Sequence, residues 1–338
     1  MDIVCLGELL IDLFPAEVGR RLVEVSAFHP KPGGAPGNVA VAARRLGLAS
    51  AFIGKVGDDA FGHFLITTLA AEGVETRAIR LDDEARTTLA FIALPDPHHA
   101  EFVFYRNPGA DTRLRQDELD EALLRQARAL HVGSLSLVAE PSRAATLRAV
   151  AIARAAGALV SFDVNYRPSL WPSPEAAVRA IHDLLPLAHV VKVNEDELRL
   201  LTGADDPDAG GAALLATGPA LAVITLGARG SAYRSAAAAG FVPGFAVQTV
   251  DAIGCGDAFM AGVLVGLLGG AGDEPWSRHL DDATLRPILR YANAVGALTA
   301  TRPGALPALP TAAEVATFLL MTADRRPRTT DHSQQTND

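Results

Sequence analysis

The alternation of short apolar runs with helical segments most constrains the fold of this 338-residue chain. Four runs rich in Val, Ile and Leu are typical of buried strands and alternate with helical segments up to residue 216; these runs are residues 129–132, 159–162, 190–193 and 222–226. A near-continuous apolar strand indicates a parallel sheet that is covered on both faces. The pattern therefore predicts a doubly wound α/β layer sandwich.

The first third of the chain begins with the same alternation and then departs from it. Residues 3–6 and 51–56 are predicted strands, and a helix is predicted over residues 58–71. In residues 87–94 and 101–106 the side-chain types alternate and include β-branched residues, a pattern typical of the two strands of a hairpin. We expect this insertion to cover a site on the main sheet as a lid.

The last third of the chain carries two further expectations about structure. Residues 231–234 and 246–250 are predicted to be short antiparallel strands joined by an Ala-rich loop. The final residues, 322–338, are polar and without periodicity, so this tail is predicted to be disordered.

Charge and cysteine content exclude several classes of protein. The formal net charge of −9 provides no general basic surface, so neither nucleic acid nor an anionic membrane is an expected partner. The two cysteines, Cys5 and Cys255, form neither a disulfide framework nor a zinc spacing. The first eight residues lack the basic start of a signal peptide, and the longest apolar run is too short to span a bilayer. These features predict a cytoplasmic protein.

A glycine-punctuated turn enters the apolar helix that is predicted over residues 258–268. The turn reads Val250-Asp251-Ala252-Ile253-Gly254-Cys255-Gly256-Asp257. Backbone N–H groups at a helix N-terminus have no intrahelical partners and can bind a phosphate group. Asp257 could then take a proton from a hydroxyl that attacks that phosphate, or could be only a favourable charge at the positive end of the helix dipole.

Two common glycine motifs are excluded by the spacing of this turn. No Lys-Ser or Lys-Thr follows it, as a Walker A loop requires. Phe259 occupies the place of the third small residue of a dinucleotide-binding fingerprint. A phosphate-binding loop of another type remains.

Four further segments could contribute to the same site. A second glycine-rich turn, Gly33-Gly34-Ala35-Pro36-Gly37-Asn38, precedes a helix predicted over residues 39–46, with Asn38 as a candidate N-cap. Asn194 and Glu197 have the spacing of a capping box, and a carboxylate there can also hold a water molecule of hydrated magnesium. A glycine turn follows the strand at 222–226, at the sheet edge where nucleotides bind in open α/β folds. Arg167 follows another strand and either binds phosphate or forms a surface ion pair.

These motifs together resemble the ribokinase-like family of carbohydrate kinases, also called the PfkB family. Two signatures carry the resemblance: Gly33-Gly34-Ala35-Pro36-Gly37-Asn38 near the start and Asp251-x-x-Gly254-x-Gly256-Asp257 near the end. Within the family the chain looks most like the fructokinases. The resemblance implies a three-layer α/β/α sandwich with a mostly parallel sheet, in one kinase domain over residues 1–321 with a small β lid from about 12–32 and 87–112.

The resemblance also implies a reaction, ATP-dependent phosphorylation of a primary sugar hydroxyl, most similar to that at O6 of fructose. Its matched positions imply Asp257 as the base and an anion hole formed by the N–H groups of Gly254, Cys255 and Gly256. The implied ligand contacts are Asp12, Gly33, Gly34, Asn38 and Arg106 for the sugar, Asn165 and Arg167 between sugar and phosphate, and Thr225, Gly227, Gly230 and Asn293 for ATP. Magnesium would be held through water by Asn194 and Glu197, and a monovalent cation, K⁺, by Asp251 and the carbonyl of Ile253.

The second signature departs from the usual family sequence Asp-Thr-Thr-Gly-Ala-Gly-Asp. Ala252 and Ile253 replace both threonines, and Cys255 replaces alanine. The base and the backbone donors are retained, whereas the surroundings of the cation are altered. A thiol at a helix N-terminus is expected to have a lowered pKa.

Alternative functions are also consistent with parts of the sequence. Asn165-Tyr166-Arg167-Pro168 resembles kinases of 2-keto-3-deoxygluconate, whose acidic substrate needs a positive partner such as Arg106 or Arg167. A catalytically silent regulator that binds sugar and nucleotide is opposed by the intact Asp257. A Rossmann oxidoreductase lacks its fingerprint in the first strand–helix turn. A homodimer is expected through the lid hairpin, because an uncovered edge strand favours pairing.

Overall fold

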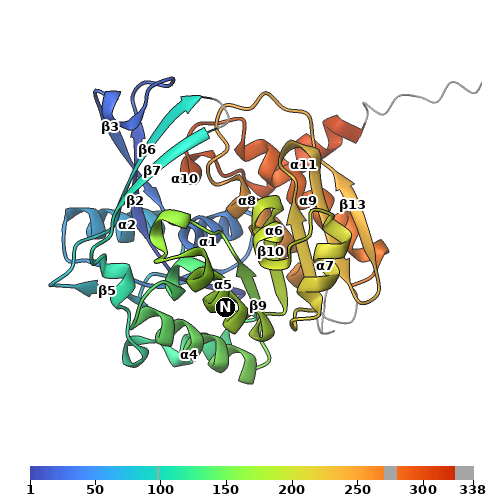
Figure 1. Cartoon of the computed structure of the whole chain (residues 1–338), viewed down its shortest axis with the longest axis horizontal. Helices are drawn as coiled ribbons and strands as arrows, with labels where there is room; N and C mark the ends of the chain where they lie inside the picture. Colours follow the sequence, from blue (N-terminus) through green and yellow to red (C-terminus); the bar gives the residue numbers. More distant parts are fainter. Residues whose placement is uncertain (97–98, 270–279, 324–338) are drawn as a thin grey trace, which may run out of the picture.

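The computed structural model describes residues 1–96, 99–269 and 280–323, and within them the chain forms two sheets. The larger has nine strands in the order β13-β12-β11-β10-β9-β8-β1-β4-β5, and its strand pairs are parallel except for β11–β12 and β12–β13. The smaller has four strands in the order β3-β2-β6-β7 and projects from the main body in Figure 1. The predicted α/β architecture with a small additional β unit is confirmed.

The strands and helices have the following bounds. The strands are β1 (Ile3–Leu6), β2 (Leu10–Pro15), β3 (Phe28–Gly33), β4 (Ser50–Gly57), β5 (Ile79–Asp82), β6 (Leu89–Asp96), β7 (His99–Tyr105), β8 (Ala129–Gly133), β9 (Leu159–Asp163), β10 (Val190–Asn194), β11 (Leu221–Thr225), β12 (Gly230–Ser235) and β13 (Ala239–Pro243). The helices are α1 (Ala35–Arg45), α2 (Ala60–Ala71), α3 (Glu121–Gln126), α4 (Ser142–Ala155), α5 (Pro174–Leu184), α6 (Glu195–Thr202), α7 (Pro207–Leu215), α8 (Cys255–Gly269), α9 (Asp282–Thr299), α10 (Ala305–Ala308) and α11 (Ala312–Ala323).

Alternation along the strands divides the interior into two cores. In β1, Ile3 and Cys5 face one core, and Val4 and Leu6 face the other, because successive side chains of a strand point to opposite faces. Helices α1, α2, α8, α9 and α11 contribute to the first core, and α3 to α7 contribute to the second. The result is the three-layer sandwich that the apolar runs predicted.

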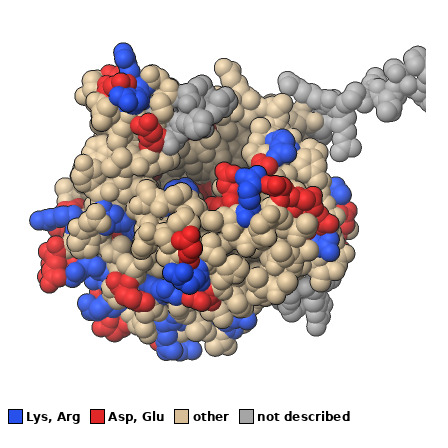
Figure 2. Space-filling model, viewed as in Figure 1, with Lys and Arg blue, Asp and Glu red and all other residues tan. Residues whose placement is uncertain are grey.

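Several polar side chains gather at one edge of the main sheet. Because β9, β10 and β11 are parallel neighbours, their carboxyl ends bring Asp163, Asn194 and Thr225 to the same edge. Helices α1 and α8 pack against each other on one face of this sheet. Figure 2 shows the face between the small sheet and the main body to be hollowed, with charged side chains at its rim.

One predicted strand is absent, and helices α1 and α8 begin four and three residues before their predicted starts at residues 39 and 258. Residues 246–250 do not form a strand; the second antiparallel strand is β13, which returns directly after a short turn. The Ser235 hydroxyl accepts the N–H groups of Ala237 and Ala238 and so closes that turn. The N–H of Val250 instead donates to the carbonyl of Ala300. These local bonds explain why the strand begins earlier than predicted.

Helix α1 begins at Ala35, four residues before the predicted start, and Asn38 is therefore not its N-cap. The N-cap is Gly34, whose φ of 104° favours glycine. Pro36 fits the first turn of a helix, where a backbone N–H has no partner to lose. The carboxamide of Asn38 is thereby free to make a tertiary contact.

At the carboxyl end, α11 continues to Ala323, so the predicted disordered tail does not begin at Thr322. The remainder of that tail, residues 324–338, lies outside the described residues. In the described part of the chain, no helix has the length and apolar character needed to cross a membrane.

Candidate active site

The N-terminus of α8 is the centre of the candidate site. Helix α8 begins at Cys255, so Asp257 lies in its first turn, as predicted. Gly254 has a φ of 80°, and a Cβ there would lie 2.9 Å from Cα of Ala305. Only glycine therefore fits this turn without strain.

The carboxylate of Asp251 accepts two backbone N–H groups at this turn. Its Oδ1 accepts the N–H of Ile253 at 2.9 Å, and its Oδ2 accepts the N–H of Gly304 at 2.8 Å. The N–H of Cys255 makes a long bond of 3.3 Å to the carbonyl of Ala252. Hydrogen bonds within the protein thus define the conformation of the turn.

The carboxylate of Asp257 is buried and held by the second glycine-rich turn. Nδ2 of Asn38, on α1, donates to Oδ2 of Asp257 at 2.8 Å. Asn38 is itself 4% exposed, and its Oδ1 has no hydrogen-bond partner among the described residues. Two motifs that lie 219 residues apart therefore meet in one hydrogen bond.

The surroundings of Asp257 favour a base that works near neutral pH. Burial, followed by the negative charge of Asp163, raises the pKa of Asp257 to about 6. The hydrogen bond from Asn38 and the positive charges of Lys192 and Arg167 oppose that rise. A pKa close to the working pH is what general-base catalysis requires.

Asp12, on β2, is a second buried carboxyl of the site. Burial and the charge of Asp257 raise the pKa of Asp12 to about 7. Gly33 lies directly against it, because a Cβ on Gly33 would be 2.0 Å from Oδ2 of Asp12. Gly34 is also tightly packed, because a Cβ on Gly34 would lie 2.5 Å from the carbonyl oxygen of Glu8. Both glycines thus allow the backbone to approach Asp12 and the segment of Glu8 and Leu9 between β1 and β2.

Arg167 is the cation that faces these two carboxyls. Its guanidinium lies 5.9 Å from the ring centre of Phe102 on β7, and its Nη1 donates to the carbonyl of Tyr166 at 3.2 Å. Its positive charge opposes the burial that raises the pKa of both Asp12 and Asp257. Asn165 precedes it in a left-handed conformation with φ of 39°. The assignment of Asn165 and Arg167 between sugar and phosphate stays a prediction.

Arg106 occupies a different environment from that of Arg167. Its Nε and Nη2 donate to Oδ2 of Asp111 at 2.8 and 2.5 Å, and Nη2 also donates to the carbonyl of Leu135 at 3.0 Å. Both charged side chains are almost fully buried. These bonds anchor the end of β7 to the main body.

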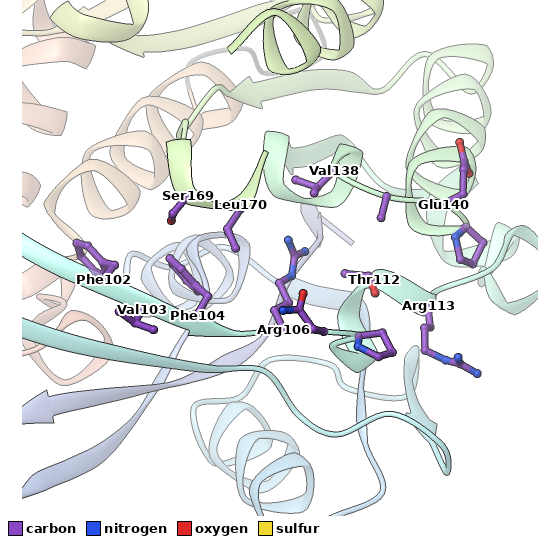
Figure 3. Close-up of a pocket in the computed structure, with 14 residues that line it drawn as sticks. Phe102, Val103, Phe104, Arg106, Thr112, Arg113, Val138, Glu140, Ser169 and Leu170 are labelled. Atoms are coloured by element: carbon purple, nitrogen blue, oxygen red, sulfur yellow. The ribbon is translucent and has the colours of Figure 1, made fainter. Parts of the chain in front are cut away.

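A cavity of about 680 Å³ lies beside Arg106, between β7 and the main body. Phe102 and Phe104 of β7 face it and stack with ring centres 6.1 Å apart, and Leu170 and Ser169 lie across from them (Figure 3). The lining is mixed, because Asn107, Thr112 and Glu140 are polar and lie beside the apolar residues. Arg106 thus contacts this cavity, while Asp12 and Asp257 are not among its lining residues.

Two charged residues of the site were not identified from the sequence. Lys192 on β10 and Asp163 on β9 are paired in register, and Nζ of Lys192 donates to Oδ1 and Oδ2 of Asp163 at 3.0 and 2.9 Å. Lys192 also lies against Gly256, where a Cβ would be 3.0 Å from Nζ. The available signal was one charged residue in each of two apolar strands, within β10 and at the end of β9, but only the strand register shows that the two residues pair.

Asn194 and Glu197 form the predicted capping box at the start of α6. Oδ1 of Asn194 accepts the N–H of Glu197, and Oε2 of Glu197 accepts the N–H of Asn194, each at 2.8 Å. Oε1 of Glu197 accepts the N–H of Tyr166 at 2.7 Å. Each carboxylate oxygen of Glu197 thus accepts one backbone N–H and keeps one further acceptor site, which fits a water molecule of hydrated magnesium.

Metal ligation by the protein alone is not indicated at the site. Among the described residues, no group of three or more His, Cys, Asp or Glu side chains could hold a metal ion. The carboxylate of Asp251 accepts two N–H groups and keeps acceptor capacity on each oxygen, which fits a monovalent cation beside the carbonyl of Ile253.

The four predicted ATP residues lie around the ends of β11 and β13. Thr225 pairs in register with Ser231, and Gly230 pairs with Pro243. Nδ2 of Asn293 donates to the carbonyls of Val242 and Pro243 at 3.1 and 3.3 Å. Asn293 therefore fastens α9 to the end of β13 through its amide group.

The two glycines of this region differ in their surroundings. A Cβ on Gly230 would lie 2.2 Å from the carbonyl of Val242, whereas a Cβ on Gly227 would meet nothing within 4 Å. Gly230 is thus required by packing, and Gly227 faces open space.

The expected lowering of the Cys255 pKa is wrong. Burial, followed by the negative charges of Asp251 and Asp257, raises the pKa of the Cys255 thiol to about 12. Desolvation and the two carboxylates outweigh the dipole of α8, so this thiol is protonated at neutral pH.

Comparison with known proteins agrees with this arrangement. Residues 1–312 match the family described as pfkB family carbohydrate kinase. The chain belongs to this family. Its ribokinase-like fold is shared with solved structures, and its enzyme class is that of phosphotransferases with an alcohol acceptor.

Similar members of the pfkB family include a plant relative and two bacterial structures. "Probable fructokinase-4" of Arabidopsis thaliana is 45% identical over 318 residues, which cover 94% of this chain and 96% of the relative. A fructokinase from Xylella fastidiosa with bound ATP has a TM-score of 0.86 at 36% identity, covering 95% of this chain and 99% of that one. A fructokinase double mutant from Vibrio cholerae O395, in a form with fructose, ADP and potassium ion bound, has a TM-score of 0.84 at 34% identity, covering 94% and 98%.

Proposed function

We propose that this chain uses ATP to phosphorylate O6 of fructose, giving fructose 6-phosphate, with Asp257 as the base. One observation carries the proposal: the buried carboxylate of Asp257 lies in the first turn of α8 and is bound by Asn38, which reaches it from the second glycine-rich turn. A base is thereby joined to an anion-binding helix N-terminus. The similar fructokinases, one with fructose and ADP bound, support fructose as the acceptor.

The proposed reaction is a direct phosphoryl transfer. Asp257 takes the proton of O6 while O6 forms a bond to the γ-phosphorus, and the bond from that phosphorus to ADP breaks with its electron pair leaving on ADP. The backbone donors of Gly254, Cys255 and Gly256 stabilise the charge of the transferred group. Because these donors are fixed before the reaction, no solvent has to reorganise.

The remaining predicted residues receive roles by position. The sugar is held by Asp12, Gly33, Gly34, Asn38 and Arg106, with Asn165 and Arg167 between sugar and phosphate, while ATP is bound along Thr225, Gly227, Gly230 and Asn293. Oδ1 of Asn38, which lacks a protein partner in the described residues, suits a sugar hydroxyl. Arg106 would act from the wall of the cavity beside β7.

The proposed ions are Mg²⁺ and K⁺. Asn194 and Glu197 would hold magnesium through water, and Asp251 with the carbonyl of Ile253 would hold potassium. When bound, these ions neutralise the negative charge of the phosphates. A cytoplasmic location is proposed as well, and both cysteines, which are free thiols, agree with a reducing compartment.

A comparison of three acceptors tests the proposed reaction. Purified protein is supplied with ATP and equal concentrations of fructose, ribose or 2-keto-3-deoxygluconate, and ADP formation is followed by a coupled assay. We expect the highest kcat/KM with fructose, because the similar proteins are fructokinases and the two carboxyls of Asp12 and Asp257 suit hydroxyl groups better than an acidic substrate. A preference for the acid would contradict fructose as the substrate. Turnover no faster than that of an Asp257→Ala variant would indicate the catalytically silent regulator.

We also propose a homodimer through the small sheet. Strand β7 is an edge strand of that sheet, and it exposes Val103 and Tyr105 by 42% and 65%. An exposed edge strand with apolar side chains favours pairing with a second copy.

A further inference from the structure

The buried ion pair of Lys192 and Asp163 lies beneath the anion-binding turn and has no role in the reaction described above. Both residues are nearly inaccessible, at 6% and 1% exposure. Val191 and Val193 pack into the core on the opposite face of the sheet, so Lys192 points towards the face that carries α1 and α8. The pair thus sits between the sheet and the first turn of α8.

A purely structural role does not account well for this position. A buried ion pair is often no more stabilising than two apolar side chains of the same size, because both charges must leave water. Moreover, the N-terminus of α8 carries positive partial charge, and the ammonium of Lys192 adds a full positive charge beside it. The negative charges of Asp163, Glu197 and Asp257 stabilise the ammonium in this position.

The donor geometry is consistent with an anion. An ammonium group has three N–H donors, and the two oxygens of Asp163 accept from Nζ. One donor remains, and Nζ lies 3.0 Å from the position that a Cβ of Gly256 would occupy. The ammonium is therefore adjacent to the backbone donors that would bind the transferred phosphoryl group.

We propose that Lys192 is a further residue of the phosphoryl-transfer site, whose ammonium stabilises negative charge on the transferred group while Asp163 positions it. This inference rests on the proposed function. Lys192 donates a hydrogen bond and transfers no proton, since the proton of the acceptor hydroxyl goes to Asp257. Asp163 touches no reacting atom and acts only through Lys192.

A variant in which an uncharged pair of similar shape replaces Lys192 and Asp163 distinguishes a role in the reaction from a purely structural role. The double variant Asp163→Asn, Lys192→Met removes both charges of the pair together. Because both residues also act on the pKa of Asp257, the pH profile of kcat/KM is recorded, and kcat is compared at a pH where Asp257 is ionised in both proteins. We expect its kcat to fall at least about a hundredfold, the usual effect of removing one oxyanion donor, with KM for the sugar unchanged within about threefold. Lys55→Met is the control: it removes another buried ammonium, which pairs with Asp82 and Glu118, and should leave kcat unchanged.

Nucleotide binding provides a readout that does not depend on turnover. Calorimetry compares the affinity for ADP alone with that for ADP and aluminium fluoride, which mimics a phosphoryl group in transfer, both with Mg²⁺. The double variant should bind ADP with the affinity of the wild type. The increase in affinity that aluminium fluoride produces should be at least about tenfold smaller in the variant than in the wild type. Unchanged kcat and unchanged fluoride affinity in a folded variant would overturn the role of Lys192. Absence of sugar phosphorylation by the wild type would instead overturn the proposed function.

Discussion

Asn38 uses the two atoms of its carboxamide differently. Nδ2 binds the base Asp257, and Oδ1 is buried without a protein partner in the described part of the chain. If Oδ1 accepts a sugar hydroxyl, one side chain fixes both the acceptor and the base. The separation between the reacting hydroxyl and Asp257 is then set by a single rigid group.

The pH dependence of activity should report this contact. For the wild type, kcat/KM should fall as the pH drops through about 6, because the base must be ionised and burial raises the pKa of Asp257 to about 6. Asn38→Ala removes a hydrogen bond that favours the ionised form. The acid limb of kcat/KM should therefore move to higher pH, and kcat should fall by about tenfold or more. An acid limb at the same pH in this variant would show that Asn38 does not act on the base.

The sequence predicted some of these residues and not others for a physical reason. Asp257 was predicted because a local motif places it at a helix N-terminus. Its bond to Asn38 and the pairing of Lys192 with Asp163 depend on which strands and helices become neighbours. Contacts between residues that are 29 or 219 positions apart produce no local pattern in the sequence.

At the scale of elements, the two helices of the site begin in different ways. Helix α8 follows a glycine turn that only glycine can adopt, and helix α1 starts at Gly34 with its first N–H bound by a side chain. Oε1 of Glu8 accepts the N–H of Ala35 at 3.0 Å. Periodicity located both helices but placed the start of α1 too late, since it could not detect a proline-containing first turn.

Gly254→Ala tests the turn before α8. The substitution places a methyl group 2.9 Å from Ala305 at a φ of 80°, so we expect a loss of stability of roughly 1–3 kcal/mol and a fall in kcat of about a hundredfold. Chemical denaturation and steady-state kinetics measure both effects. Gly269→Ala, at the other end of α8, is the matched control, because a Cβ there meets nothing within 4 Å. Equal behaviour of the two variants would contradict the account of the turn.

Glu8→Gln tests the junction of β1 and α1 through the pH dependence of stability. Burial raises the pKa of Glu8 to about 7, so the folded state binds a proton more tightly than the unfolded state does. The stability from this group is complete below about pH 4 and is lost as the pH rises through about 7. Glutamine keeps the acceptor for Ala35 without the charge. The variant should be more stable than the wild type at pH 8 by roughly 1–3 kcal/mol and nearly equal at pH 5; a thermal-unfolding difference that is the same at both values would contradict this.

At the scale of the whole molecule, the site lies where two sheets come together. The main sheet supplies the strand ends that carry Asp163 and Asn194, and the small sheet supplies Asp12 and Phe102. The apolar runs predicted the main sheet because its strands are buried on both faces. The junction of the sheets was not predictable in detail, because it depends on tertiary contacts such as the Arg106–Asp111 pair at the end of β7.

The small sheet should also determine the oligomeric state. Light scattering at micromolar concentration should give twice the 35.3 kDa mass of one chain. Val103→Lys places a charge on the exposed edge strand β7 and should reduce the mass to that of a monomer. A wild-type monomer, or a dimer that survives this substitution, would exclude pairing through β7.

The central claim is that Asp257 is the base of sugar phosphorylation, and Asp257→Asn tests it most directly. Asparagine has nearly the same shape but cannot accept the proton of the attacking hydroxyl. Fructose-dependent ADP formation is measured for both proteins, and ATP binding is measured by calorimetry. We predict that kcat falls at least about a hundredfold while nucleotide affinity changes less than about threefold. A variant that retains kcat within tenfold of the wild type would contradict the assignment.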